Sequence, residues 1–331
     1  MNNEIFNTKN ELSKRIQSNV LFVALVELMI YTGGLRIKYA VQRMINFFTP
    51  LVGEKYTLYY NSNFWLIIPI LILLAFMWLT CRNAMSVFTE GTMARKLKSL
   101  GKGLLIGFAA NGILALLAGI SHTIEYSFNE FEPLVLPLIF FVFIQCTAEE
   151  VLLRGYVPAV LGKEHSWDAV AFVSGALFIF HHELNMLYYG FNSIFCLNVF
   201  LIGVFLCLLI KWDGNFWIAC GFHTAWNYMQ FHILGLSNSG STPDVCILKG
   251  ANSASSFFFD YVYGFEGSLC DSFNYNWNPA ADPKTPTHKQ RRNVIHISSN
   301  LLSSLYRYPF LKPYIGGIST SIGFLKAPSE V

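Results

Sequence analysis

Charged residues are scarce in this sequence. Only 13% of the 331 residues are Asp, Glu, Lys or Arg, and 53% are hydrophobic, whereas a soluble domain has about 25% charged residues. Long stretches of the chain therefore lack a charged face to present to water, which argues against a soluble protein. The formal net charge of +3 is small, so we expect no nucleic-acid partner. It does suit contact with a lipid bilayer that contains anionic lipid.

Several signatures of metal sites and soluble hydrolases are also missing. None of the seven cysteines forms a Cys-x-x-Cys pair, which argues against a disulfide framework and against a thiolate zinc site. Neither a His-Glu-x-x-His nor a Gly-x-Ser-x-Gly pattern occurs, so zincin and serine-esterase chemistry have no support. We expect no cofactor and no metal, with zinc kept as a minor alternative for the His and Glu residues described below.

The sequence contains instead a series of long apolar runs. A spanning helix needs about twenty mostly apolar residues. About seven stretches come close, at residues 20–35, 64–81, 104–122, 133–153, 167–182, 191–210 and 216–235. We therefore predict an all-α fold, a multi-pass transmembrane helical bundle with about seven spanning helices, or eight as the alternative.

These runs also predict the organisation of the chain. We expect a cytoplasmic N-terminal segment at residues 1–19, a bundle at 20–270 with its catalytic core at about 133–235, and a polar or interfacial tail at 271–331. Lysine and arginine concentrate in the predicted loop at 82–102. That loop should be cytoplasmic, because basic residues are enriched in cytoplasmic loops.

The first polar cluster in an apolar run consists of Glu149, Glu150 and Arg154. A charge inside a spanning helix costs roughly 2.5–3.5 kcal/mol on insertion scales, so such residues are candidates for function. Glu150 and Arg154 are four residues apart and share a helix face, whereas Glu149 points about 100° away. Glu149 could then act as a general base toward water. The alternative is a helix end at which these charges snorkel into water.

Two further clusters bring histidines. His181 and His182 end a run that contains Phe178, and His223 and Asn227 lie four residues apart inside another run. Imidazoles exchange protons near neutral pH, and His and Asn side chains can donate hydrogen bonds to an oxyanion. The alternatives are an interfacial histidine pair and an interhelical hydrogen-bonded pair. Taken together, the three clusters supply a base, an imidazole and oxyanion donors, which is the set that a hydrolase needs.

These clusters resemble the CAAX prenyl protease and bacteriocin-processing family of intramembrane peptidases. That family's Glu-Glu-x-x-x-Arg, Phe-x-x-x-His and His-x-x-x-Asn motifs occur here in order, over about residues 133–231. The segment 264–268, Gly-Phe-Glu-Gly-Ser, is also similar to a family segment, although a polar tail follows where the family commonly adds a helix.

The resemblance implies a role for each position. Glu149 and His182 would activate the hydrolytic water, and His223 and Asn227 would stabilise the oxyanion. The substrate-binding or structural residues would be Glu150, Arg154, Phe178 and His181, and His181 stays an alternative to His182 as the inward histidine.

The family resemblance leaves more than one function open. We expect an intramembrane peptidase whose partner is a peptide or membrane-protein substrate. A non-enzymatic immunity or scaffold protein of the same family is the alternative, and a transporter is a weaker one because no paired repeats with broken helices occur. We expect an integral membrane protein of a bacterial plasma membrane, with the endoplasmic reticulum as the alternative host.

Overall fold

The computed structural model describes residues 19–26, 29, 67–80, 85–133, 135–243, 245–251, 257 and 259–268. Residues 1–18 of the predicted N-terminal segment, the tail at 271–331 and half of the first apolar run lie outside these residues.

The described chain is mostly helical, which confirms the predicted helical membrane bundle. Its helices are α4 (Ile67–Thr80), α5 (Ser86–Thr89), α6 (Met93–Ile120), α7 (Val135–Glu150), α8 (Val157–Leu161), α9 (Trp167–His181), α10 (Glu183–Tyr189), α11 (Ser193–Asp213) and α12 (Trp217–Tyr228). A π-helical turn, η2 (Val151–Tyr156), joins α7 to α8, and a second one, η3 (Met229–Ile233), continues α12. A 3₁₀ turn, η4 (Phe265–Gly267), lies near the end of the described chain.

Within this part of the chain, three helices are long and apolar enough to cross a membrane. They are Met93–Ile120, Val135–Leu161 and Ser193–Asp213, and the second of them comprises α7, η2 and α8. The helix Trp167–His181 is apolar but shorter. The predicted number of about seven spans therefore stays a prediction.

One predicted boundary is wrong, because α6 begins eleven residues before the predicted start at residue 104. Arg95 and Lys102, which the sequence placed in a loop, lie in the first turns of this helix. Thr92 caps it by accepting a hydrogen bond from the backbone N–H of Arg95 at 3.3 Å. The Lys102 ammonium lies 2.6 Å from a carboxylate oxygen of Asp213 at the end of α11. This capping and ion pairing make a basic helical turn stable in a position where hydropathy alone predicts a loop.

Helices α6 and α12 pack backbone against backbone. A Cβ atom added at Gly103 would lie 2.1 Å from the carbonyl oxygen of Ile218, and one at Gly107 would lie 2.5 Å from that of Phe222. Small residues four apart allow this close approach in membrane helices. The contact holds α12, which carries His223, at a fixed distance from α6.

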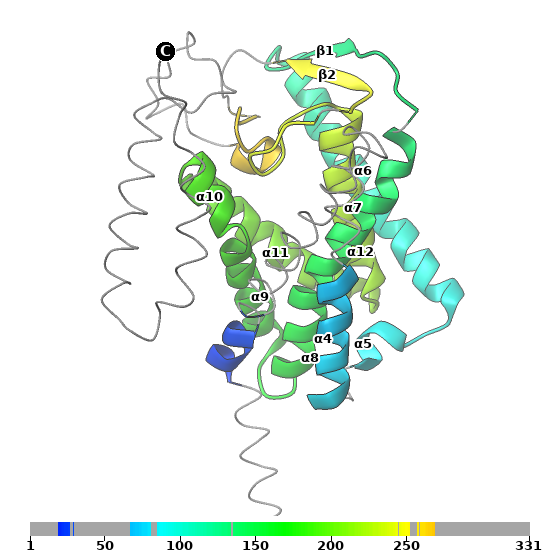
Figure 1. The fold of residues 1–331 in the computed structure, drawn as a ribbon, viewed down its shortest axis with the longest axis vertical. Helices are drawn as coiled ribbons and strands as arrows, with labels where there is room; N and C mark the ends of the chain where they lie inside the picture. Colours follow the sequence, from blue (N-terminus) through cyan, green and yellow to red (C-terminus); the bar gives the residue numbers. More distant parts are fainter. Residues whose placement is uncertain are drawn as a thin grey trace, which may run out of the picture. The chain divides into compact units, whose positions relative to one another are not determined.

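A two-stranded ribbon, visible in Figure 1, was not predicted. Strand β1 (Glu125–Phe128) pairs antiparallel with β2 (Leu248–Ala251), with Glu125 opposite Ala251. The short helix α10 was not predicted either. Both elements are too short to give a clear periodic signal in the sequence.

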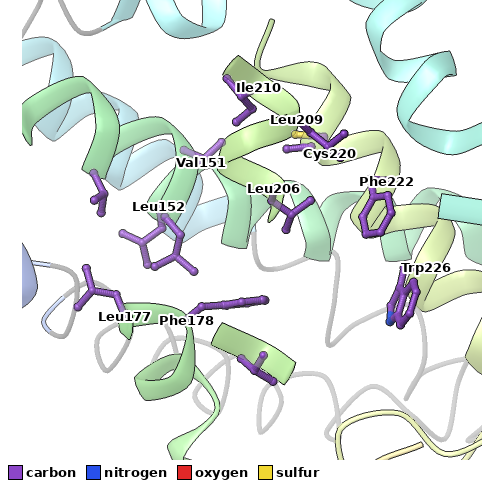
Figure 2. Close-up of a cluster of buried hydrophobic side chains, with 14 of the residues drawn as sticks. Val151, Leu152, Leu177, Phe178, Leu206, Leu209, Ile210, Cys220, Phe222 and Trp226 are labelled. Atoms are coloured by element: carbon purple, nitrogen blue, oxygen red, sulfur yellow. The ribbon is translucent and has the colours of Figure 1, made fainter. Parts of the chain in front are cut away.

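Apolar side chains from several helices form one core beside the polar residues. Figure 2 shows Val151 and Leu152 from η2, Phe178 from α9, Leu206 from α11 and Phe222 from α12 in this cluster. All but Leu206 lie within or directly beside the polar motifs in the sequence, so this packing fixes the directions in which those motifs project.

Candidate active site

The two adjacent carboxylates lie near the middle of a long apolar helix. The sequence predicted that the run ends near Leu153, but the helix continues through η2 and α8 to Leu161. Glu150 is 0% exposed and Arg154 is 1% exposed. These two groups therefore lie inside the bundle, and the alternative in which they snorkel at a helix end is wrong.

Glu150 and Arg154 form the predicted pair. The Arg154 Nη1 atom donates to Oε1 of Glu150 at 3.2 Å. The guanidinium also lies over the Phe178 ring, 4.2 Å from its centroid. Electrostatic attraction to the ring face adds to the ion pair in this buried position. Phe178 thus contacts the charge pair as well as carrying the histidine motif of α9.

His223 bridges the two carboxylates. Its Nδ1 atom lies 2.9 Å from Oε1 of Glu150, and its Nε2 atom lies 3.9 Å from Oε2 of Glu149. The carboxylate of Glu150 accepts a hydrogen bond, so Nδ1 carries the hydrogen and Nε2 is directed toward Glu149. The ring is 7% exposed. Glu150 therefore sets the orientation of the His223 ring.

The histidines at the end of α9 lie beside the same carboxylate. His182 is partly buried, and its Nδ1 atom donates to the backbone carbonyl of Phe178 at 2.9 Å, which leaves Nε2 for other contacts. The ring packs edge-on against Phe178, with centroids 4.8 Å apart. Both His181 and His182 interact electrostatically with Glu149. The structure brings both histidines to Glu149, and the choice between them stays open.

Asn227 lies one helical turn after His223 and is partly exposed. Its Nδ2 atom donates to Sγ of Cys146 at 3.5 Å, and its Oδ1 atom accepts from Nδ2 of Asn238 at 3.3 Å. Cys146 is on α7, one turn before Glu150. The amide N–H face of Asn227 is therefore turned toward the helix that carries the two glutamates.

The cluster has a buried side and an accessible side. Glu150, Arg154 and His223 are buried, whereas Glu149, His182 and Asn227 are partly exposed. The side chain of Glu149 is 14% exposed. Glu149 can meet a substrate and water directly, whereas Glu150 is 0% exposed, so the two adjacent glutamates have different chemical roles open to them.

Sequence reasoning missed four residues that contact the cluster. Gln145 donates to Glu149 at 3.5 Å, and Cys146 accepts from Asn227. Both lie one turn before a glutamate, so helical spacing could have identified them. Glu266 lies in the segment 264–268 and interacts electrostatically with His223 and Glu149. Asn238 follows α12 in an irregular segment without a periodic signal.

Among the residues that the structure describes, no group of three or more His, Cys, Asp or Glu side chains is arranged to hold a metal ion.

The fold and the site define a helical membrane protein with a Glu/His/Asn cluster inside its bundle. Comparison with protein families matches residues 130–229 to the Rce1-like family, the type II CAAX prenyl endopeptidase Rce1-like proteins. The matched stretch contains all three motifs. The resemblance found in the sequence is confirmed, and the chain is an integral membrane protein related to CAAX-type intramembrane proteases. A search of curated proteins found no match.

Proposed function

We propose that this protein is an intramembrane endopeptidase that hydrolyses a peptide bond with a water molecule activated by Glu149 and His182. The proposal rests on the different surroundings of the two adjacent glutamates. Glu149 is partly exposed next to three imidazoles, whereas Glu150 is buried against Arg154 and His223. A carboxylate that lines an accessible polar site is suited to be a general base.

The proposed reaction begins with water held between Glu149 and Nε2 of His182. As the water oxygen attacks the carbonyl carbon of the peptide, its proton passes to Glu149. The tetrahedral intermediate then collapses, the C–N bond breaks, and Glu149 returns the proton to the leaving amine. No covalent bond to the enzyme forms, which fits a site in which the Glu and His groups are the candidate proton carriers.

His223 and Asn227 are proposed to stabilise the oxyanion. In its doubly protonated form His223 keeps its Nδ1–H bond to Glu150, and its Nε2–H, on the side of Glu149, can donate to the developing negative charge. Asn227 adds an amide N–H from one helical turn further along α12. Donors fixed in a water-poor site stabilise the transition state more than the ground state.

The family match supports a substrate of CAAX type, a peptide with a prenylated cysteine near its carboxyl end. We propose a peptide or membrane-protein segment as the substrate. The bacterial plasma membrane stays the expected host, and a prenylated substrate would fit the alternative host, the endoplasmic reticulum.

The proposal is tested with Glu149→Gln, which keeps the shape of the side chain and removes the base. We expect cleavage of a prenylated CAAX peptide by the purified full chain, followed by mass spectrometry, to fall by about 10²–10⁴-fold. Glu164→Gln, in the exposed turn after α8, is the matched control and should cleave at the wild-type rate. Full activity of Glu149→Gln would contradict the peptidase mechanism and would favour the immunity or scaffold role.

A further inference from the structure

A tight turn lies directly beside Asn227. Asn238 and Ser241 exchange two backbone hydrogen bonds of 2.9 Å, and Ser239 and Gly240 form the two-residue loop between them. Both loop residues have positive φ, 46° at Ser239 and 91° at Gly240. Such a loop favours Asn or Gly at its first position. A serine in the left-handed region is strained, so other contacts must hold it there.

Neighbouring segments supply those contacts. Asn185 of α10 donates to the carbonyl of Ser239 at 2.7 Å. Gln230 of η3 donates to the carbonyl of Ser237, also at 2.7 Å. The backbone N–H of Gly240 donates to the carbonyl of Val262 at 3.1 Å. The turn is therefore fixed from three directions.

Glu266 joins this turn to the catalytic helix. One of its carboxylate oxygens accepts from the Ser239 hydroxyl at 2.6 Å, and the other accepts from Nε1 of Trp226 at 3.3 Å. Trp226 precedes Asn227 in α12. Asn198 of α11 donates to the Glu266 carbonyl at 2.7 Å and so holds the backbone of this segment. Hydrogen-bonded connections of this kind fix the positions of the groups at their ends.

Asn238 in this turn touches the proposed oxyanion donor. A side-chain amide can be placed in two orientations that exchange its oxygen and nitrogen. The Asn238 amide donates to Oδ1 of Asn227, which leaves Nδ2 on the side of Cys146. The thiol sulfur is a weak acceptor, so an oxyanion can compete with it for the amide hydrogens.

We propose that Asn238 is a positioning residue that holds the Asn227 amide with its N–H group facing the oxyanion, and that the Ser239–Glu266 hydrogen bond holds the turn that presents Asn238. The proposal rests on the oxyanion role of Asn227 in the proposed function. It assigns a purpose to the buried carboxylate of Glu266 and to the unusual backbone at Ser239.

The test compares kcat and KM of three variants on a prenylated CAAX peptide. In Asn238→Asp, a carboxylate replaces the amide donor, so the Asn227 amide turns over and presents its oxygen to the oxyanion. We expect kcat to fall by about 10²–10³-fold, the loss for one oxyanion donor, with KM unchanged because the donor acts in the transition state. Asn238→Ala leaves both orientations accessible and should lose less than about tenfold.

The matched control is Asn129→Asp, the same change of charge and shape outside the site. Asn129 donates to the carbonyl of Cys246 at 3.3 Å, and its variant should keep the wild-type kcat. Thermal unfolding in detergent checks that every variant is folded. If Asn238→Asp does not fold, the Asn238→Ala variant is used in its place in the double-mutant comparison.

A double variant that combines the Asn238 substitution with Asn227→Ala tests whether Asn238 acts through Asn227. Once Asn227 is absent, a substitution at Asn238 should change kcat no further, because the two residues act as one unit. An equal loss in both backgrounds, or a wild-type kcat of Asn238→Asp, would overturn the inference. Full activity of Glu149→Gln and of Asn227→Ala would instead overturn the proposed function itself.

Discussion

Arg154 determines the charge balance of the buried side of the site. It is paired with Glu150 at 3.2 Å and lies over the Phe178 ring. Glu150 in turn accepts from His223. One cation thus stabilises the carboxylate that orients a proposed oxyanion donor.

We therefore predict that Arg154→Met is destabilised by about 3–5 kcal/mol, the cost of leaving one member of a buried ion pair without its partner. Unfolding of the purified chain in detergent measures this. The double variant Glu150→Leu/Arg154→Met should recover part of the stability but no peptidase activity, because His223 has lost its orienting acceptor. Lys163→Met, at an exposed position, is the control. Equal stability of Arg154→Met and the control would contradict the prediction.

Glu266 provides a test based on pH. Burial raises the pKa of this carboxyl, although the Ser239 and Trp226 donors oppose the shift. The folded state then holds a proton that the unfolded state releases at a lower pH, so stability falls as the pH rises from the unfolded pKa, about 4.3, through the raised folded pKa. Glu266→Gln has no such loss. We expect its Tm advantage over the wild type to grow between about pH 4 and pH 7.

The control for this measurement is Glu164→Gln, which removes one exposed negative charge. Its Tm difference from the wild type should change less over the same range than that of Glu266→Gln. A difference at Glu266 that shrinks as the pH rises would show that the carboxylate is stabilised in the folded protein.

At the scale of the elements, the contact between α6 and α12 is the most sensitive to substitution. Gly107 lies against the backbone of Phe222, and an added Cβ would also lie 2.8 Å from that of Ala225. We predict that Gly107→Ala costs about 1–3 kcal/mol by overpacking and lowers peptidase activity, because His223 lies between those two contacts. Thermal unfolding and peptide cleavage measure the two effects.

The same helix offers the matched control. A Cβ added at Gly101 would meet nothing within 4 Å, so Gly101→Ala should be neutral or more stable by up to about 1 kcal/mol through helix propensity. If both variants behave alike, close packing at Gly107 is not what holds α12.

The elements also show what hydropathy can and cannot predict. The runs that became α9 and α11 were predicted within three residues at each end, because their apolar residues are bounded by capping side chains, Ser166 and Asn192. The helix that carries Glu149 was predicted too short. Charged residues that pair inside the bundle interrupt the apolar run in the sequence, and such an interruption is typical of a helix end. Among the motif residues, Glu150 contacts both Arg154 and His223 in the structure, and the proposed catalytic roles stay predictions. The bridging position of His223 and the contact from Asn238 depend on tertiary structure, which no spacing encodes.

At the scale of the whole bundle, basic residues gather at one end of the helices and acidic residues at the other. Arg95 and Lys102 at the start of α6 meet Asp213 at the end of α11, and Lys211 lies 3.8 Å from Asp168 at the start of α9. These helix ends therefore lie on one side. The acidic residues Glu125, Glu130 and Glu132 follow the other end of α6. Basic residues favour the cytoplasmic side.

We predict that this basic side faces the cytoplasm. In intact cells a membrane-impermeant maleimide should label Glu130→Cys, whereas Lys163→Cys should react only after the membrane is permeabilised. Both positions are exposed, and the unmodified chain gives the background from its own cysteines. The reverse pattern would show that the bundle is inserted in the opposite orientation.

The π-helical turn that follows the glutamates has a consequence for the phase of the helix. A π turn, closed by i→i+5 hydrogen bonds, contains one residue more than an α turn. The side chains of α8 therefore point in directions that differ from those of an uninterrupted continuation of α7. Glu150 directly precedes the π turn and Arg154 lies within it. A one-residue deletion after Arg154 would be absorbed by η2 becoming α-helical. Such a deletion should leave both glutamates in place and keep the face that Pro158–Leu161 presents, whereas the same deletion in a regular α-helix would turn the following face by about 100°.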